Sequence, residues 1–301
     1  MTQLPGDRAS APRRDGRAFD HGSSSYVRGS LATLRPVADT VNHRQVAVLL
    51  DEDPDLAPGL DEQEFEAARR RAVAAVLEIE PPTWNTAAIR EEAEEGWLGL
   101  YVLDGLLLRR VKVGKRAACE LFGPGDLIRP WDTDGEYDPL PITVDWLVLK
   151  SARMAILDTA FVMRVARWPT INGRIVSRVA QRARYLALTQ AVTHLPRAYA
   201  RLLILFWLLA ERWGKVGRDG VHVSLPLTHE VLAMLVGAHR PTVTIALQRL
   251  TRAGYLIRES TDRWLLTNWA IERLEHPESL ALIEPANGHE HESPESLADA
   301  P

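Results

Sequence analysis

The sequence predicts an α+β fold in which short strands precede a long helix and a C-terminal helix-turn-helix. Over residues 97–158, short apolar runs alternate with turns rich in Gly and Asp, which is typical of a small β-barrel or jelly roll. The apolar spacing over 170–195 is helical, and Pro196 ends that run. Residues 228–254 then form two short amphipathic segments that are broken at Gly237.

The strand-rich region contains four apolar runs, at 98–111, 117–122, 144–149 and 154–158. A turn at 123–126 follows the second run. Before them, the Ala- and Glu-rich residues 61–79 have the apolar spacing of a helix, which Pro81 and Pro82 would end. We therefore expect one helix and then a barrel.

The long helix carries a stripe of residues at alternating spacings of three and four, made of Val176, Val179, Ala183, Leu186 and Gln190. Such a stripe favours the seam of a twofold dimer, although packing against the chain's own barrel would give the same pattern. Residues 197–213 form a further helix, whose apolar face is wide enough to be mostly buried core.

Local signals mark the ends of the two C-terminal helices. Thr228 can cap the first helix, and Gly237 supplies the permissive backbone that a tight turn needs. The second helix begins around His239, Arg240 and Pro241, because a first-turn proline removes only an amide that has no partner. Its buried face then contains Val243, Ala246, Leu247 and Leu250.

The opposite face of the second helix has the chemistry of a surface that reads DNA. Gln248 can form two hydrogen bonds with adenine, and Arg240 can contact a guanine edge or a phosphate. Thr244 can reach a base edge or a phosphate, and an outward Ile245 can pack on thymine methyl groups.

A hairpin, or wing, follows the second helix. Residues 255–259 and 263–267 are two β-like runs, and Arg258 and Arg263 would lie near the flanking DNA backbone. A winged helix used only for protein contacts is the alternative interpretation. The residues that we expect to contact DNA are Thr228, His239, Arg240, Pro241, Thr242, Thr244, Ile245, Gln248, Arg252, Arg258 and Arg263.

This stretch resembles the C-terminal domain of the CRP/FNR family of bacterial transcription regulators. The residues that match the family pattern are Thr228, Leu232, Ala233, Leu235, Val236, Gly237, His239, Arg240, Thr242, Val243, Leu247 and Leu250. The resemblance implies that Arg240 reads a guanine and that Thr242 holds a phosphate. Pro241 stands where the family has an acidic base reader, and Ile245 stands where it has a second arginine reader. We therefore expect a target sequence that differs from the best-known family operator.

The strand-rich region resembles the cyclic-nucleotide-binding-like domain that precedes the DNA-binding domain in this family. Residues 100–105 match its strand and Gly turn, and residues 121–126 match its Gly-Asp corner. The whole resemblance covers roughly residues 40–270. It implies a sensory β-barrel.

The residues that a cyclic nucleotide needs are not in place. After the Gly-Asp corner, family members that bind cyclic AMP have a Gly-Glu pair that accepts the ribose hydroxyl, whereas Arg129 and Pro130 follow here. Residues 133–142 contain no basic residue to hold the cyclic phosphate. We therefore expect no cyclic-nucleotide binding, no cofactor and an effector of unknown identity. The candidate effector-pocket residues are Gly125, Asp126 and Arg129, with a surface salt bridge as the alternative role of Arg129.

The net charge of −4 conceals a basic C-terminal domain. Residues 275–301 contain seven acidic residues and no Lys or Arg, and we expect them to be disordered, like the Arg-, Ser- and Pro-rich residues 1–25. Residues 197–274 contain eleven basic and six acidic residues, which suits a partner rich in phosphate.

Other classes of protein find little support. No apolar run reaches the roughly 18 to 20 residues of a membrane span, and the N-terminus lacks the apolar region of a signal peptide, so we expect a cytoplasmic protein. The single cysteine, Cys119, excludes an internal disulfide. The nine histidines lack metal-binding spacing, and no phosphate loop or nucleophile elbow is present. We expect neither a metal nor an enzyme.

The sequence thus predicts a transcription regulator that binds a two-half-site operator as a homodimer and acts through RNA polymerase. The rival hypothesis is a ligand-sensing β-barrel protein whose winged helix contacts other proteins. The domain limits that we expect are 1–25 for a disordered tail, 26–167 for the sensory barrel, 168–195 for the dimerisation helix, 196–274 for the winged helix and 275–301 for an acidic tail.

Overall fold

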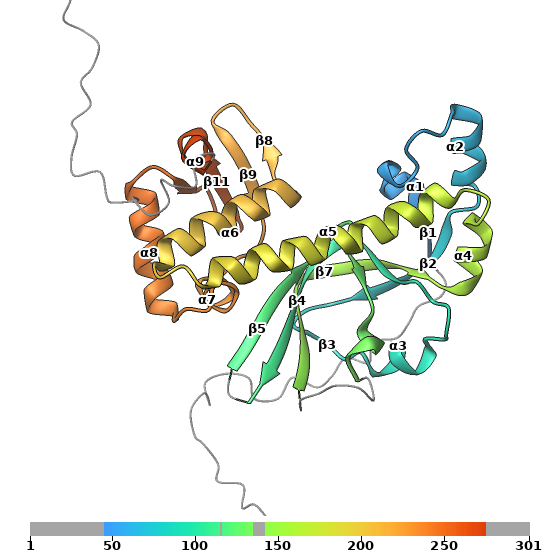
Figure 1. The fold of residues 1–301 in the computed structure, drawn as a ribbon, viewed down its shortest axis with the longest axis horizontal. Helices are drawn as coiled ribbons and strands as arrows, with labels where there is room; N and C mark the ends of the chain where they lie inside the picture. The colour runs from blue at the N-terminus through green and yellow to red at the C-terminus, as the bar shows by residue number, and fades with distance from the viewer. Residues whose placement is uncertain (1–44, 115, 135–141, 275–301) are drawn as a thin grey trace, which may run out of the picture. The chain divides into compact units, whose positions relative to one another are not determined.

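The computed structural model describes residues 45–114, 116–134 and 142–274 (Figure 1). The predicted tails at 1–25 and 275–301 lie outside these residues. The first half is an antiparallel sheet, and the second half is a helical domain with a small sheet of its own. The α+β fold class is confirmed.

The N-terminal sheet is built around two long strands, β4 (Gly99–Val113) and β7 (Ile142–Leu157), which pair along most of their length. The strand order is β1-β2-β7-β4-β5, with β3 also on β7 and β6 also on β4. The shorter strands are β1 (Val46–Val48), β2 (Val73–Ile79), β3 (Thr83–Trp84), β5 (Arg116–Phe122) and β6 (Leu127–Ile128). Around the sheet lie α1 (Leu49–Glu52), α2 (Glu62–Arg69), α3 (Ala87–Glu92), α4 (Thr159–Val165) and the 3-10 turns η1 (Pro54–Leu56) and η2 (Pro130–Asp134).

The two long strands bend because their pairing is irregular in the middle. The register shifts between Val102 and Leu107, where β4 crosses β7. Gly105 has φ 105° at this point, and a Cβ there would collide with the backbone of Ala152. A glycine is therefore needed for the strands to approach each other closely.

The predicted helix over 61–79 is wrong in its second half. The helix ends at Arg69, and Val73–Ile79 form the strand β2 between β1 and β7. The Ala-rich composition favours a helix, but Ala74 and Val76 fill the core of the sheet. Tertiary pairing thus overrides local propensity here.

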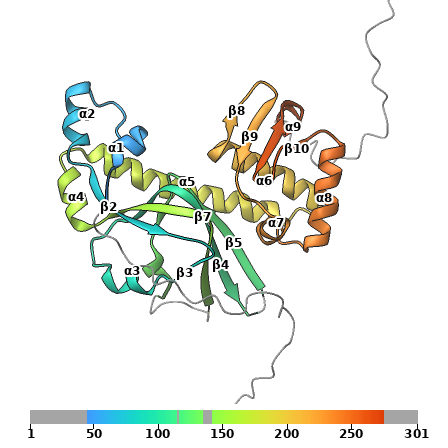
Figure 2. The same cartoon turned by 180° about the vertical axis from the view of Figure 1, so that it is seen from behind.

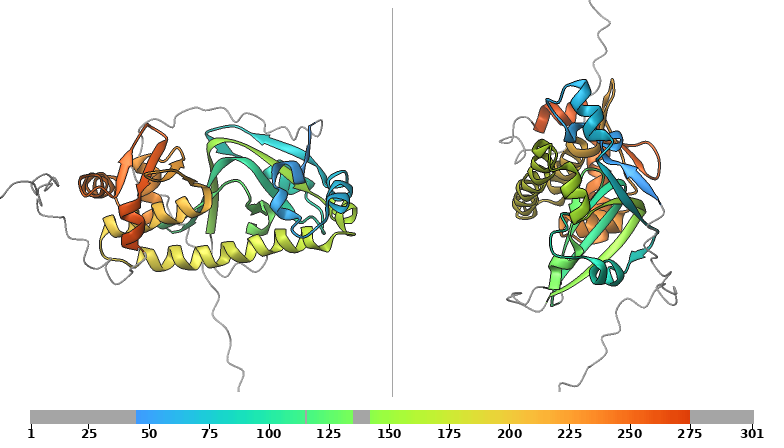
Figure 3. Two further views of the ribbon diagram at one scale, coloured as in Figure 1. Left: turned by 90° about the horizontal axis from the view of Figure 1, so that it is seen from above. Right: turned by 90° about the vertical axis from the view of Figure 1, so that its right-hand side faces the viewer.

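A long helix, α5 (Pro169–Thr193), runs along one side of the curved sheet (Figure 3). It occupies the stretch where the sequence predicts a long helix. Ile171 and Ile175, near its start, are buried against the core that also contains Phe161 and Tyr101. Beyond them the helix is mostly half-buried or exposed.

The C-terminal part contains the predicted helix-turn-helix and wing. The helices are α6 (Ala198–Trp213), α7 (His229–Val236), α8 (Arg240–Arg252) and α9 (Asn268–Leu274). The strands are β8 (Lys215–Val216), β9 (Gly220–Ser224), β10 (Leu256–Arg258) and β11 (Arg263–Thr267), in the order β10-β11-β9-β8. Figure 2 labels β8, β9 and β10 of this sheet. The hairpin β10–β11 is the predicted wing, whereas β8 and β9 were not predicted.

The winged helix and the N-terminal sheet share one hydrophobic core. Leu106, Leu108 and Leu121 of the sheet belong to the same cluster as the apolar side chains of α6, α7 and α8. Helix α7 contacts strand β5 directly. Among the described helices, none combines the length and the apolar character that crossing a membrane would require.

Candidate nucleic-acid interface and effector pocket

The turn between α7 and α8 is fixed from both sides. The Thr228 hydroxyl accepts a hydrogen bond from the Val231 amide at 3.2 Å and so caps α7. Gly237 ends that helix with φ 60° and ψ 44°, a left-handed conformation that favours glycine. Arg201 of α6 donates to the carbonyls of Val236 at 2.8 Å and Gly237 at 3.3 Å. The turn that leads into α8 is therefore held by α6.

Helix α8 has one buried face and one exposed face. Val243, Ala246, Leu247 and Leu250 are buried, as their spacing predicts. Ile245 lies opposite them, and its apolar side chain is 68% exposed to solvent. A large exposed apolar side chain can mark a binding surface. The other exposed residues predicted to contact DNA are Thr228, His239, Arg240, Pro241, Thr242, Gln248, Arg252, Arg258 and Arg263.

Thr244 is half-buried, and its hydroxyl is engaged within the protein. The hydroxyl donates to the Arg240 carbonyl at 3.1 Å and lies 2.9 Å from Nδ1 of His229. With the hydroxyl proton on Arg240, the Thr244 oxygen can accept a hydrogen bond from Nδ1 of His229.

Sequence reasoning missed His229. It lines a hollow of about 290 Å³ between α8 and the wing, together with Thr244, Gln248, Arg252 and Arg258. The signal that could have found it is its position directly after the capping Thr228, on the helix that leads to the reading face.

The wing arginines differ in their surroundings. Arg258 donates to the carbonyls of Ser260 at 3.2 Å and Thr261 at 3.3 Å, and it lies over the Trp264 ring at 5.3 Å. Arg263 pairs with Glu259 at 2.8 Å, with half of its side chain exposed. Arg258 therefore orders the wing turn, and Arg263 leaves part of its guanidinium at the surface.

His229 is expected to titrate below the ordinary histidine range. Burial, and then the positive charges of Arg258 and Arg240, lower the pKa of His229. The unfolded chain, with an ordinary pKa of about 6.5, then binds the proton more tightly, so stability is lost as the pH falls through that value. Titration of the ring by NMR checks the direction. Replacing His229 with Gln should remove this part of the pH dependence of unfolding, and a His229 pKa at or above 6.5 would contradict the expectation.

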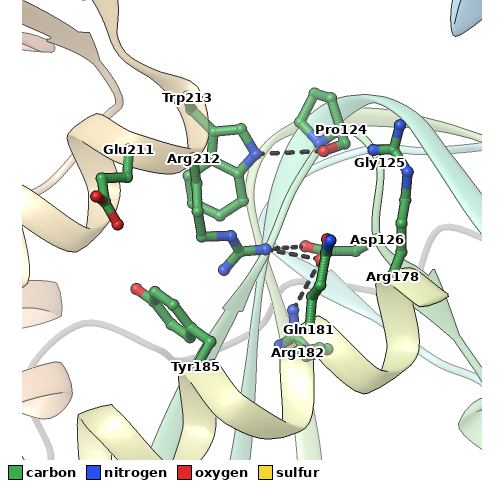
Figure 4. Close-up of a pocket in the computed structure, with 10 residues that line it drawn as sticks. All are labelled: Pro124, Gly125, Asp126, Arg178, Gln181, Arg182, Tyr185, Glu211, Arg212 and Trp213. Atoms are coloured by element: carbon green, nitrogen blue, oxygen red, sulfur yellow. Dashed lines mark hydrogen bonds and ion pairs between the residues drawn. The ribbon is translucent and has the colours of Figure 1, made fainter. Parts of the chain in front are cut away.

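The candidate effector residues do not converge on one site. The Asp126 carboxylate accepts from the Gly123 amide at 2.8 Å and from Arg212 at 2.6 and 2.7 Å, and it pairs with Arg182 at 3.0 Å. Together with Gly125, it lines a cavity of about 300 Å³ (Figure 4). Arg129 lines a different hollow, next to α5.

Arg129 is held by its own surroundings. It donates to the carbonyl of Trp97 at 2.6 Å and to that of Leu98 at 3.1 Å, and it pairs with Asp132 at 2.6 Å. Its side chain is 41% exposed. The arrangement is that of a surface salt bridge rather than of an anion-binding group.

Two further observations concern the free cysteine and the metal-binding side chains. Cys119 is a free, half-buried thiol, and burial raises its pKa. Within the residues that the structure describes, no three His, Cys, Asp or Glu side chains gather as a metal site would need.

A curved antiparallel sheet, a long helix and a winged helix-turn-helix together define the class of DNA-binding regulators. Residues 199–275 match the family model described as a Crp-like helix-turn-helix domain. The regulatory protein CysR of Synechococcus elongatus is 31% identical over 160 residues, covering 52% of this chain and 68% of that protein. The chain belongs to the CRP/FNR family of transcription regulators.

Two further proteins are similar over most of their own length. The CRP-like cAMP-activated global transcriptional regulator of Mycobacterium tuberculosis is 28% identical over 203 residues, covering 64% of this chain and 87% of that protein. A cyclic nucleotide-binding domain containing protein from Listeria monocytogenes shares the fold at a TM-score of 0.50 and 14% identity, covering 64% and 89% of the two chains. The Listeria structure shows the shared fold, and the family model with the curated relatives shows that the chain is a DNA-binding regulator of transcription.

Proposed function

We propose that this regulator binds DNA through the exposed face of α8, with one α8 in each half-site of a palindromic operator. The observation that carries the proposal is the separation of the two faces of that helix. Its apolar residues are buried in the domain, whereas Arg240, Ile245 and Gln248 stand outside. A helix with this pattern, preceded by a turn that Arg201 holds, can enter the major groove without unpacking.

Each exposed residue has a proposed role in the half-site. Arg240 contacts guanine, as in the family, and Thr242 holds a phosphate. Ile245 packs against thymine methyl groups, and Gln248 pairs with adenine. Pro241 contributes shape alone, because it has no group that reads a base. Thr228, His239, Arg252, Arg258 and Arg263 are proposed to contact the flanking backbone.

Dimerisation through α5 supplies the second half-site. Val176, Val179 and Leu186 are 55%, 46% and 40% exposed, and Ala183 and Gln190 on the same stripe are exposed too. A second copy of the helix would remove this surface from water. The twofold axis then places two α8 helices one duplex turn apart.

The barrel is proposed to be a sensory or scaffold domain that does not take a cyclic nucleotide. The DNA-bound dimer would recruit or block RNA polymerase. No catalytic role is proposed, because the relatives are regulators.

Selection of sites from random duplex DNA with the full-length protein tests the proposal. We expect a palindrome whose half-sites are about one duplex turn apart, with affinity that falls as salt rises because phosphate contacts release counterions. Sedimentation of the free protein at several concentrations measures the dimer separately. Failure to enrich any sequence at low salt would favour the rival role, in which the winged helix contacts a protein.

A further inference from the structure

A cavity lies where the Gly-Asp corner of the sheet meets α5 and α6. It has a volume of about 300 Å³, at the lower end of the range of small-ligand pockets. Its lining includes the guanidinium groups of Arg178, Arg182 and Arg212 and the rings of Tyr185 and Trp213 (Figure 4).

A buried chain of alternating charges leads to this cavity. Glu120 pairs with Arg109 and with Arg182, each at 2.5 Å. Asp126 pairs with Arg182 at 3.0 Å and with Arg212 at 2.6 Å. Three guanidinium groups therefore share two carboxylates, so the chain carries one net positive charge, with Arg109 at one end and Arg212 at the other. Glu211 adds one carboxylate to the cavity lining, next to Arg178, Arg182 and Arg212. A buried net charge is costly, so the Arg212 end of the chain favours an anionic partner.

Arg212 is positioned to hold such a partner. Its Nη2 binds Asp126, while its Nη1 is buried and makes no hydrogen bond of ordinary geometry with the described residues. The guanidinium also interacts with the Tyr185 hydroxyl, where it opposes the rise in the pKa of Tyr185 that burial causes. Figure 4 draws this second nitrogen on the side of the guanidinium away from Asp126. The rings of Trp213 at 4.0 Å and Tyr185 at 4.6 Å fix the plane of the guanidinium. The unused donor is therefore held in a set direction.

We propose that this cavity binds a small organic anion, and that a phosphate or carboxylate oxygen of the ligand accepts a hydrogen bond from Nη1 of Arg212. The ligand completes the alternating chain without displacing Asp126. Arg178 also lines the cavity. Because Arg178 already pairs with Asp53 at 2.6 Å, we expect it to contact the ligand less strongly than Arg212 does.

Binding at this place would reach the DNA-binding domain. Arg212 and Trp213 end α6, which carries much of the winged-helix core, and Trp213 donates to the Pro124 carbonyl of the sheet at 3.3 Å. An anion on Arg212 would tighten this contact between sheet and α6. The anion site itself does not depend on the proposed function. Only the role of the ligand as an effector of DNA binding rests on it.

Calorimetric titration of the full-length protein with inorganic phosphate, and separately with citrate, at constant ionic strength tests the site. We expect saturable binding of at least one anion, with the tighter of the two identifying the oxyanion class. Arg212→Lys, which keeps the charge but removes Nη1, should weaken binding at least tenfold. The matched change Arg129→Lys should leave binding unchanged, because Arg129 lies outside the cavity.

A second variant covers the case in which Arg212→Lys does not fold. Gln181→Trp fills the exposed mouth of the cavity without touching the ion chain, and it should abolish binding. Absence of saturable binding for both anions, or wild-type affinity in Gln181→Trp, overturns the inference. Operator binding measured on the same samples separates the two proposals. Anion binding without operator binding would remove the proposed function and leave the cavity assignment standing.

Discussion

Replacing Arg240 with alanine should abolish sequence-specific DNA binding while the protein remains folded. The residue is exposed at the first turn of α8, so its truncation removes no core packing. A bidentate arginine–guanine contact contributes about 1–3 kcal/mol of discrimination, and a dimer makes it twice. The expected loss on the selected operator is therefore on the order of 2–6 kcal/mol. Fluorescence anisotropy with labelled operator measures it.

The matched control is Arg218→Ala, which removes the same charge from an exposed position between β8 and β9. It should change affinity little and equally for operator and unrelated DNA. Wild-type operator affinity in the Arg240 variant would show that α8 does not read the groove. If a protein partner then still bound the variant, the winged helix would be a docking surface.

Replacing Asp126 with asparagine should destabilise the fold strongly. The residue is 8% exposed and holds Arg182, Arg212 and the Gly123 amide. Removing the carboxylate leaves two guanidinium groups buried beside a neutral amide. Breaking a buried ion pair from one side costs about 3–5 kcal/mol. Urea unfolding at neutral pH, followed by circular dichroism, measures the loss.

Asp132→Asn is the control for that experiment. Asp132 pairs with Arg129 at 2.6 Å, but its side chain is 53% exposed. Exposed ion pairs contribute about 0–1 kcal/mol, so the unfolding midpoint should move little. Equal losses for the two variants would mean that the Asp126 network does not hold the sheet to α6.

The helix-turn-helix could be predicted because its signals are local. The cap at Thr228, the turn at Gly237 and the spacing of the buried residues of α8 all lie within one short stretch of chain. The strands β2 and β9 could not be predicted in the same way. Ala-rich β2 is a strand only because β1 and β7 flank it, and β9 pairs with β11, some forty residues further along the chain.

The candidate site was predictable only in part, for the same reason. The exposed residues of α8 follow from helical periodicity. The contact between His229 and Thr244 joins two helices, and the contact between Asp126 and Arg212 joins residues 86 positions apart. No spacing within a single element encodes such pairs. The effector pocket at Gly125, Asp126 and Arg129 stays a prediction, and the structure places Arg129 in a different hollow from the other two residues.

The core that the sheet shares with the winged helix bears on how such regulators can be recombined. Leu106, Leu108 and Leu121 pack into the apolar cluster of the DNA-binding half. A chimaera that joined this winged helix to a relative's barrel would set these side chains against partners of different shape. Mismatched packing typically costs about 1–3 kcal/mol at each such position. We therefore expect such a chimaera to be less stable than either parent, whereas changes at the exposed residues of α8 leave this shared core intact.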